Sequence, residues 1–218
     1  MSEMLSKPLS PKFTEAVGYA LDAHRTQSRK GTEIPYAAHI LAVASLVLEM
    51  EADEDEAIAA LLHDVIEDAG AHHAEEIERR FGPDVLAIVR ANSDTDQQPK
   101  PPWLERKRAY IAGIATKSPA AVRVSIADKL HNARSNVDDQ QRYGDEIFER
   151  FRSDAGGEFA SKRDGVVWYY EALVEAFEAR RADIGPGAAA KLDDLARAVG
   201  ELRAGAVRFP PPGATDSV

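Results

Sequence analysis

The apolar residues of this chain recur every three or four positions, and that spacing predicts α-helices. Segments that alternate apolar and polar residues, as strands do, are nearly absent. Glycine and proline residues separate the periodic segments and mark their ends. The predicted helices cover residues 11–27, 36–50, 53–70, 73–81, 83–92, 103–117, 119–137, 145–152, 165–181 and 188–204. We therefore expect an all-α bundle of some eight to ten helices.

The breaks in this pattern suggest how the chain is organised. Periodic segments from residue 11 to residue 183 are expected to form one compact domain. An extra C-terminal helix is expected within 184–205, and the proline-rich segment 206–218 reads as a disordered tail. The polar, proline-bearing segment 92–102 predicts a loop that is long enough to suggest a functional role.

Composition narrows the chemistry that the chain can perform. Its 218 residues include no cysteine, which excludes disulfides, thiolate metal ligands and a cysteine nucleophile. A net charge of −10 argues against general binding of nucleic acid or membrane surfaces, which require positive charge. The N-terminus lacks the apolar stretch of a signal peptide, and no segment approaches about 18 apolar residues, so we expect a cytoplasmic protein. Positive charge is nevertheless concentrated locally in HRTQSRK (24–30) and KPPWLERKR (100–108), which suit a small, multiply charged anion or are solvated helix ends.

The segment LLHDVIED, residues 61–68, places four ionisable residues inside an apolar stretch. In a continuous helix, His63 and Glu67 lie one turn apart, as do Asp64 and Asp68, so that they form two rows on one face. Either this face is solvated, or its carboxylates surround a cation that offsets their repulsion.

Two other predicted helices carry residues of the same kind. His39 lies near the start of an apolar helix, where a lone histidine is more often a hydrogen-bonded core residue than a ligand. Asp128, Asn132 and Ser135 form a polar stripe at spacings of four and three residues. Together with the histidine and aspartate of LLHDVIED, they supply two imidazoles and two carboxylates from three helices. That set suits a divalent ion such as Mn²⁺, Fe²⁺, Zn²⁺ or Mg²⁺.

The order of these residues resembles a known family. His39, then His63-Asp64, then Asp128 follows the H…HD…D pattern of the HD superfamily of metal-dependent phosphohydrolases. The dipeptide HD alone is a weak signal, but RKGTEIPYAAHILAVA, AALLHDVIEDAG and IADKLHNARS together are specific. Over roughly residues 13–180 the chain is similar to the hydrolase domains of RelA and SpoT homologues, and in particular to the small alarmone hydrolases.

The resemblance implies an HD-domain helical bundle that hydrolyses (p)ppGpp between its pyrophosphate and the ribose 3′ oxygen. In that family the cofactor is a divalent metal, Mn²⁺ in the alarmone hydrolases. The metal ligands that it implies are His39, His63, Asp64 and Asp128, and the catalytic acids are Glu67 and Asp68. The substrate contacts that it implies are Arg29, Lys30, Lys100, Asn132, Ser135 and Arg163, with an aromatic residue among 168–170.

The chain also departs from the family pattern. The loop before His39 is one residue shorter than in the animal enzymes, and Ile40 replaces a proline that often follows this histidine. Segment 92–102 differs in length, and the helix after Gly185 is extra. These departures leave other substrates open, namely the NADPH 2′-phosphate, a nucleoside monophosphate or a dNTP. A nucleotide-binding protein without turnover and a helical interaction module are further alternatives. The last helix covers the bundle or meets another subunit of a homo-oligomer.

Overall fold

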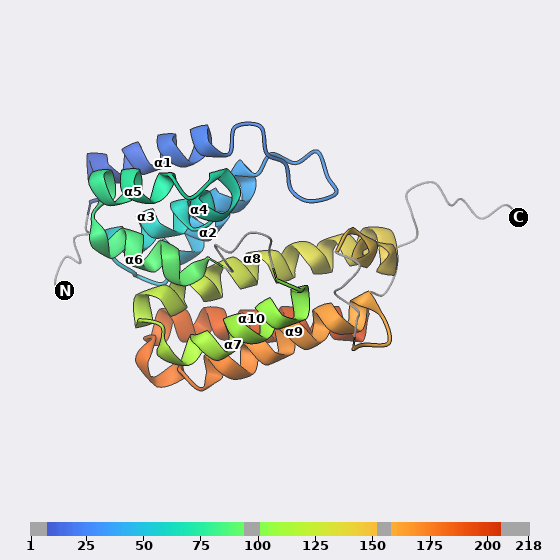
Figure 1. The fold of residues 1–218 in the computed structure, drawn as a ribbon. Helices are drawn as coiled ribbons and strands as arrows, with labels where there is room; N and C mark the ends of the chain where they lie inside the picture. The colour runs from blue at the N-terminus through green and yellow to red at the C-terminus, as the bar shows by residue number, and fades with distance from the viewer. Residues whose placement is uncertain (1–7, 94–100, 152–157, 206–218) are drawn as a thin grey trace, which may run out of the picture.

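The computed structural model describes residues 8–93, 101–151 and 158–205. In these ranges it contains ten α-helices, short 3₁₀ segments and no β-strand, and only Ser28 and Pro35 form an isolated antiparallel bridge (Figure 1). The α-helices are α1 (Pro11–Ala23), α2 (Ala37–Glu49), α3 (Glu54–Leu62), α4 (Val65–Ala69), α5 (His73–Phe81), α6 (Pro83–Asn92), α7 (Trp103–Gly113), α8 (Pro119–Tyr143), α9 (Lys162–Glu178) and α10 (Pro186–Ala204). The predicted all-α fold is confirmed. None of the described helices combines the length and apolarity needed to cross a membrane.

Local sequence signals explain where several helices begin. The Ser10 side chain accepts a hydrogen bond from the Lys12 amide, and Pro11 occupies the first turn of α1. Asp53 and Glu56 form a capping box at the start of α3, in which each side chain accepts from the other residue's backbone N–H. Both helix starts are therefore determined within one turn of the sequence.

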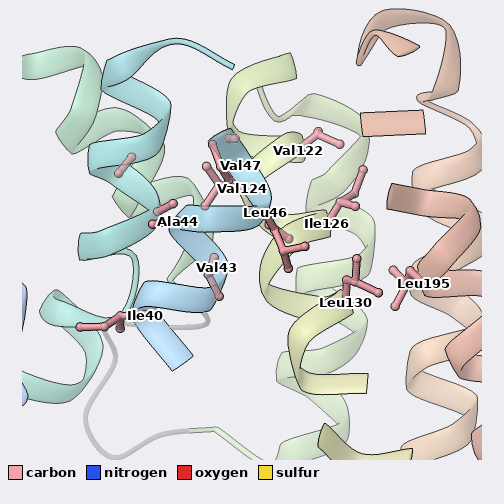
Figure 2. Close-up of a cluster of buried hydrophobic side chains, with 14 of the residues drawn as sticks. Ile40, Val43, Ala44, Leu46, Val47, Val122, Val124, Ile126, Leu130 and Leu195 are labelled. Atoms are coloured by element: carbon pink, nitrogen blue, oxygen red, sulfur yellow. The ribbon is translucent and has the colours of Figure 1, made fainter. Parts of the chain in front are cut away.

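The long helix α8 lies between two groups of helices, with α1–α6 on one side and α7, α9 and α10 on the other (Figure 1). Figure 2 shows the apolar side chains that join α8 to α2 and to α10. Val47, Ile126, Leu130 and Leu195 in this cluster are fully buried. Because α8 is packed from both sides, its polar residues are held in place relative to α2 and α3.

The predicted continuous helix over residues 53–70 is wrong. Helix α3 ends at Leu62 and α4 begins at Val65, so that His63 and Asp64 lie in the turn between them. Asp64 has φ −102° and ψ −5°, away from helical values near −63° and −42°. The Asp68 amide still donates to the Asp64 carbonyl at 2.9 Å, so the apolar spacing continues through the distorted turn and conceals it.

The C-terminal part also differs from expectation. Helix α8 continues to Tyr143 and ends where Gly144 adopts a positive φ of 68°, and residues 144–150 form a 3₁₀ segment instead of an α-helix. Helix α10 covers the bundle, since it packs on α8 and α9 through buried Leu192, Leu195 and Leu202. A domain boundary near residue 183 stays a prediction, and the expected tail lies outside the described residues.

Candidate active site

The side chains of the four predicted metal ligands converge from three parts of the chain. Nε2 of His39 lies 3.3 Å from Oδ1 of Asp128 and 3.7 Å from Oδ2 of Asp64. Nε2 of His63 lies 3.0 Å from Oδ2 of Asp64 and 3.7 Å from Oδ1 of Asp128. Two donors about 2.1 Å from one ion are about 3.0 Å apart when they subtend a right angle. The ligand atoms of His39, His63 and Asp128 all lie within 4.8 Å of one another, which fits a single divalent ion, and Asp64 lies beside both imidazoles.

The two imidazoles are arranged as metal ligands require. His39 and His63 are at most 1% exposed, and their Nε2 atoms have no hydrogen-bond partner among the described residues. Nδ1 of His63 lies 2.8 Å from the Ala60 carbonyl, to which it must donate, so Nε2 is the nitrogen left to face the carboxylates and to bind an ion. Nδ1 of His39 lies 2.8 Å from Nδ1 of His131. Because buried nitrogens without a partner are costly, an ion at this position would satisfy both rings.

The charges of the site also favour a bound cation. Burial acts to raise the pKa of Asp64 and of Asp128, but neighbouring cationic groups hold both values below the ordinary range. The largest of these opposing effects comes from the His63 imidazole on Asp64 and from the Lys129 ammonium on Asp128. Burial acts to lower the pKa of His63, yet without an ion the same two carboxylates raise it well above its usual value, so that they favour positive charge at Nε2. The carboxylates thus stay ionised and attract positive charge into the space between the imidazoles.

Hydrogen bonds fix the orientation of both carboxylates. The Tyr36 hydroxyl donates to Oδ2 of Asp64. Asn132 donates from Nδ2 to Oδ1 of Asp128 at 2.5 Å, and the Lys129 ammonium lies 2.5 Å from Oδ2. Partners of this kind hold metal ligands in position. Sequence analysis did not identify Tyr36 or Lys129, because only the folded chain brings them to these acids.

The two predicted catalytic acids lie in different surroundings. Glu67 lines a cavity of about 140 Å³ together with Asp64 and Asp128. Asp68 accepts a hydrogen bond of 2.7 Å from Nε2 of Gln27 in the loop that follows α1. Glu67 is therefore the acid that shares a cavity with the carboxylates of the metal cluster, whereas Asp68 is joined to the loop that carries Arg29.

A larger cavity of about 510 Å³, hereafter the cleft, lies beside the small one. Its cationic lining residues are Arg29, Lys30, Lys107, Lys129, Arg142 and Arg150, and its aromatic ones are Tyr36, Trp103, Phe151, Tyr169 and Tyr170. Arg150 is engaged with Asp139 at 2.5 Å and with Asn136 at 2.6 Å. Asn132 and Ser135, two of the predicted substrate contacts, also line the cleft. This combination suits an anionic ligand that carries a planar ring.

Of the predicted substrate contacts that the structure describes, Arg163 is not part of the cleft lining. Lys100 lies outside the described residues. The Arg163 guanidinium donates to the carbonyls of Leu202 and Arg203, at 3.2 Å and 2.6 Å, and so binds the C-terminal end of α10. Family resemblance could not reveal this contact, since α10 is the helix that departs from the family pattern.

Sequence comparison identifies the family. An HD domain model matches residues 16–153. This chain belongs to the HD domain family. The guanosine-3′,5′-bis(diphosphate) 3′-pyrophosphohydrolase MESH1 of Drosophila melanogaster is 44% identical over 129 residues, which are 57% of this chain and 69% of that protein. Human MESH1 is 38% identical over 126 residues, covering 56% of this chain and 68% of the relative. The bifunctional (p)ppGpp synthase/hydrolase SpoT of Escherichia coli is 35% identical over 130 residues, covering 57% of this chain and 18% of SpoT.

Solved structures extend the similarity of this HD domain protein. The structure of a metazoan orthologue of SpoT that hydrolyses ppGpp aligns with a TM-score of 0.69 and 31% identity. That alignment covers 90% of this chain and 99% of the other. The protein lmo0812 of Listeria monocytogenes EGD-e shares the fold, with a TM-score of 0.58 and 24% identity. That alignment covers 74% of this chain and 96% of the other. The resemblance to the MESH1 and SpoT hydrolases is confirmed.

Proposed function

We propose that this protein is a metal-dependent hydrolase of (p)ppGpp that releases the 3′-pyrophosphate, with Mn²⁺ as its metal. One observation carries the proposal. The buried cluster of His39, His63 and Asp128, whose ligand atoms lie within 4.8 Å of one another, adjoins a cationic cleft. Support comes from the relatives, because MESH1 of Drosophila melanogaster, at 44% identity, is a guanosine-3′,5′-bis(diphosphate) 3′-pyrophosphohydrolase. A cytoplasmic location is part of this proposal.

His39, His63, Asp64 and Asp128 would hold the ion. When bound, a divalent ion supplies Lewis acidity, which polarises a phosphoryl oxygen and makes water more acidic. Glu67, in the cavity beside these ligands, takes the proton of the attacking water. The water oxygen bonds to the phosphorus that carries the ribose 3′ oxygen, and the bond between that phosphorus and the 3′ oxygen breaks. The 3′ oxygen takes a proton from solvent and leaves as a hydroxyl, and Glu67 returns its proton to solvent.

The rest of the cleft binds the substrate. Arg29 and Lys30 supply charged donors for phosphate oxygens. Asn132 and Ser135 lie where they can contact the nucleoside, while Asn132 also holds Asp128. Asp68, through its hydrogen bond to Gln27, keeps the loop with Arg29 against the site and supports the water network near Glu67.

The test is hydrolysis by the purified full-length chain with Mn²⁺, read as pyrophosphate release from ppGpp. A parallel panel contains NADPH, nucleoside monophosphates and dNTPs. We expect ppGpp to be the preferred substrate, and we expect Glu67→Gln to lose turnover at least about 100-fold while it retains metal. The matched control Glu175→Gln, at an exposed position of α9, should behave as wild type. No release of pyrophosphate, alongside turnover of another nucleotide in the panel, would contradict the proposal.

A further inference from the structure

Lys107 and Tyr169 lie where the cleft and the small cavity meet. Both residues line the cleft, and both line the 140 Å³ cavity that contains Asp64 and Glu67. The Lys107 ammonium lies 5.0 Å from the centre of the Tyr169 ring, so the two side chains form one group. A ligand that passes from the cleft towards the carboxylates of the metal cluster therefore passes these two residues.

The hydroxyl of Tyr169 has an unusual environment. The residue is 6% exposed, and its hydroxyl has no hydrogen-bond partner among the described residues. Buried polar groups are nearly always paired, and a tyrosine hydroxyl is a good donor. Burial raises the pKa of Tyr169 well above its ordinary value, so the hydroxyl stays protonated. It is consequently a donor that a ligand in the cavity can use.

Lys107 provides charge beside this hydroxyl. Burial, together with the nearby positive charges of Lys129 and Arg106, lowers the pKa of Lys107 to about 7, while Glu67 acts in the opposite direction. A pKa of about 7 leaves this amine about half protonated near pH 7, and a bound anion would favour the ammonium form. Lys129, the other lysine that lines both cavities, is engaged with Asp128 at 2.5 Å. The wall between the cavities therefore presents an ammonium and a hydroxyl donor to an anionic ligand.

We propose that Lys107 and Tyr169 together bind non-bridging oxygens of the pyrophosphate group where it crosses from the cleft into the small cavity. This assignment deepens the proposed function and rests on it. Binding through both donors holds the phosphorus beside Glu67 and the metal ligands, and it offsets negative charge on the transferred phosphoryl group. A substrate with a single phosphate would lose the contacts that the second phosphate makes.

The test uses inorganic pyrophosphate as the probe, titrated calorimetrically into the Mn²⁺-loaded full-length chain. Lys107→Met should weaken binding roughly 10- to 100-fold, as expected for loss of a charged hydrogen-bond donor. Tyr169→Phe should weaken it roughly 3- to 10-fold without loss of thermal stability, because the hydroxyl that it removes has no partner within the described protein. The controls Arg108→Met and Tyr143→Phe, at positions 57% and 65% exposed, should bind as wild type.

The outcomes separate this assignment from the proposed function. Weaker pyrophosphate binding by both variants supports the assignment, even if the wild type fails to hydrolyse ppGpp and so contradicts the function. Wild-type pyrophosphate affinity in both variants overturns the assignment, as does a wild type that binds no pyrophosphate, even if ppGpp is hydrolysed. Should Lys107→Met not fold, Lys107→Gln and Tyr169→Phe decide the question by the same measurement.

Discussion

His131 should determine how well His39 binds a metal ion. The two Nδ1 atoms are 2.8 Å apart, and His39 is fully buried. Burial, with further contributions from His39 and Arg29, lowers the pKa of His131 to about 4. Its ring is therefore neutral near pH 7 and can accept the proton that His39 carries on Nδ1. This bond leaves Nε2 of His39 with its lone pair directed at the metal position.

We predict that His131→Phe weakens Mn²⁺ binding, because phenylalanine keeps the ring contact with His39 but removes the acceptor. Loss of such a supporting hydrogen bond typically costs 10- to 100-fold in metal affinity, or about 1.4–2.7 kcal/mol. That range agrees with about 1–3 kcal/mol for a buried donor left without its acceptor. Water cannot replace the acceptor easily, since the His39 side chain is only 1% exposed.

The assay is competition for Mn²⁺ between the protein and a fluorescent chelator. Wild type is compared with His131→Phe, with His131→Asn, which retains an acceptor oxygen, and with His72→Asn at an exposed position. His131→Asn should recover part of the Mn²⁺ affinity, and the control His72→Asn should match wild type. A Mn²⁺ affinity of His131→Phe within two-fold of wild type would refute this account of His39.

Three further predictions concern stability, each checked by urea denaturation. Arg123→Met should cost roughly 3 kcal/mol, because it leaves the Glu56 carboxylate, 3% exposed and now 2.5 Å from Arg123, without its cation. Because the pKa of Lys107 is about 7 in the folded protein and 10.5 in the unfolded chain, the unfolded chain binds more protons than the folded protein between these pH values. The free energy of unfolding of the wild type should therefore rise with pH in that interval. This rise should exceed the one measured for Lys107→Met by up to about 1.4 kcal/mol per pH unit. If the free energy of unfolding changed equally with pH in both proteins, the assigned pKa would be contradicted. Gly187→Ala should destabilise the protein by about 1–3 kcal/mol, since the added Cβ would lie 2.6 Å from the Met50 carbonyl oxygen. An unchanged midpoint of urea denaturation would contradict that close contact.

The sequence predicted most helices because their signals are local. Caps such as Ser10 and the Asp53–Glu56 box act within one turn, and apolar spacing identifies the buried face. The break at His63–Asp64 was missed for the same reason, because a single distorted turn leaves the spacing of apolar residues unchanged. Local periodicity therefore predicts that a helix exists better than it predicts whether the helix is continuous.

The candidate site was predictable where the family motif names residues, and much less so elsewhere. His39 and Asp128 are 89 positions apart in the sequence but lie close together in the structure. The family motif implied this proximity, whereas the spacing of residues along the chain could not establish it. Lys107 lies in the basic segment 100–108 and Tyr169 in the aromatic stretch 168–170, whereas Tyr36 belongs to an ordinary-looking position. Only the packing of distant helices brings these residues to the cavities. For Arg163, the family resemblance implied a substrate contact, but in the structure its guanidinium donates to a carbonyl at the end of the extra helix α10.

The central claim is that His39, His63, Asp64 and Asp128 bind a single divalent ion. The most direct measurement is an anomalous difference map at the manganese absorption edge, from crystals of the full-length chain grown with Mn²⁺. The account predicts one strong peak about 2.0–2.4 Å from Nε2 of both histidines and from one oxygen of each aspartate. A map without a peak there, or with the manganese bound away from His63 or Asp128, would contradict it.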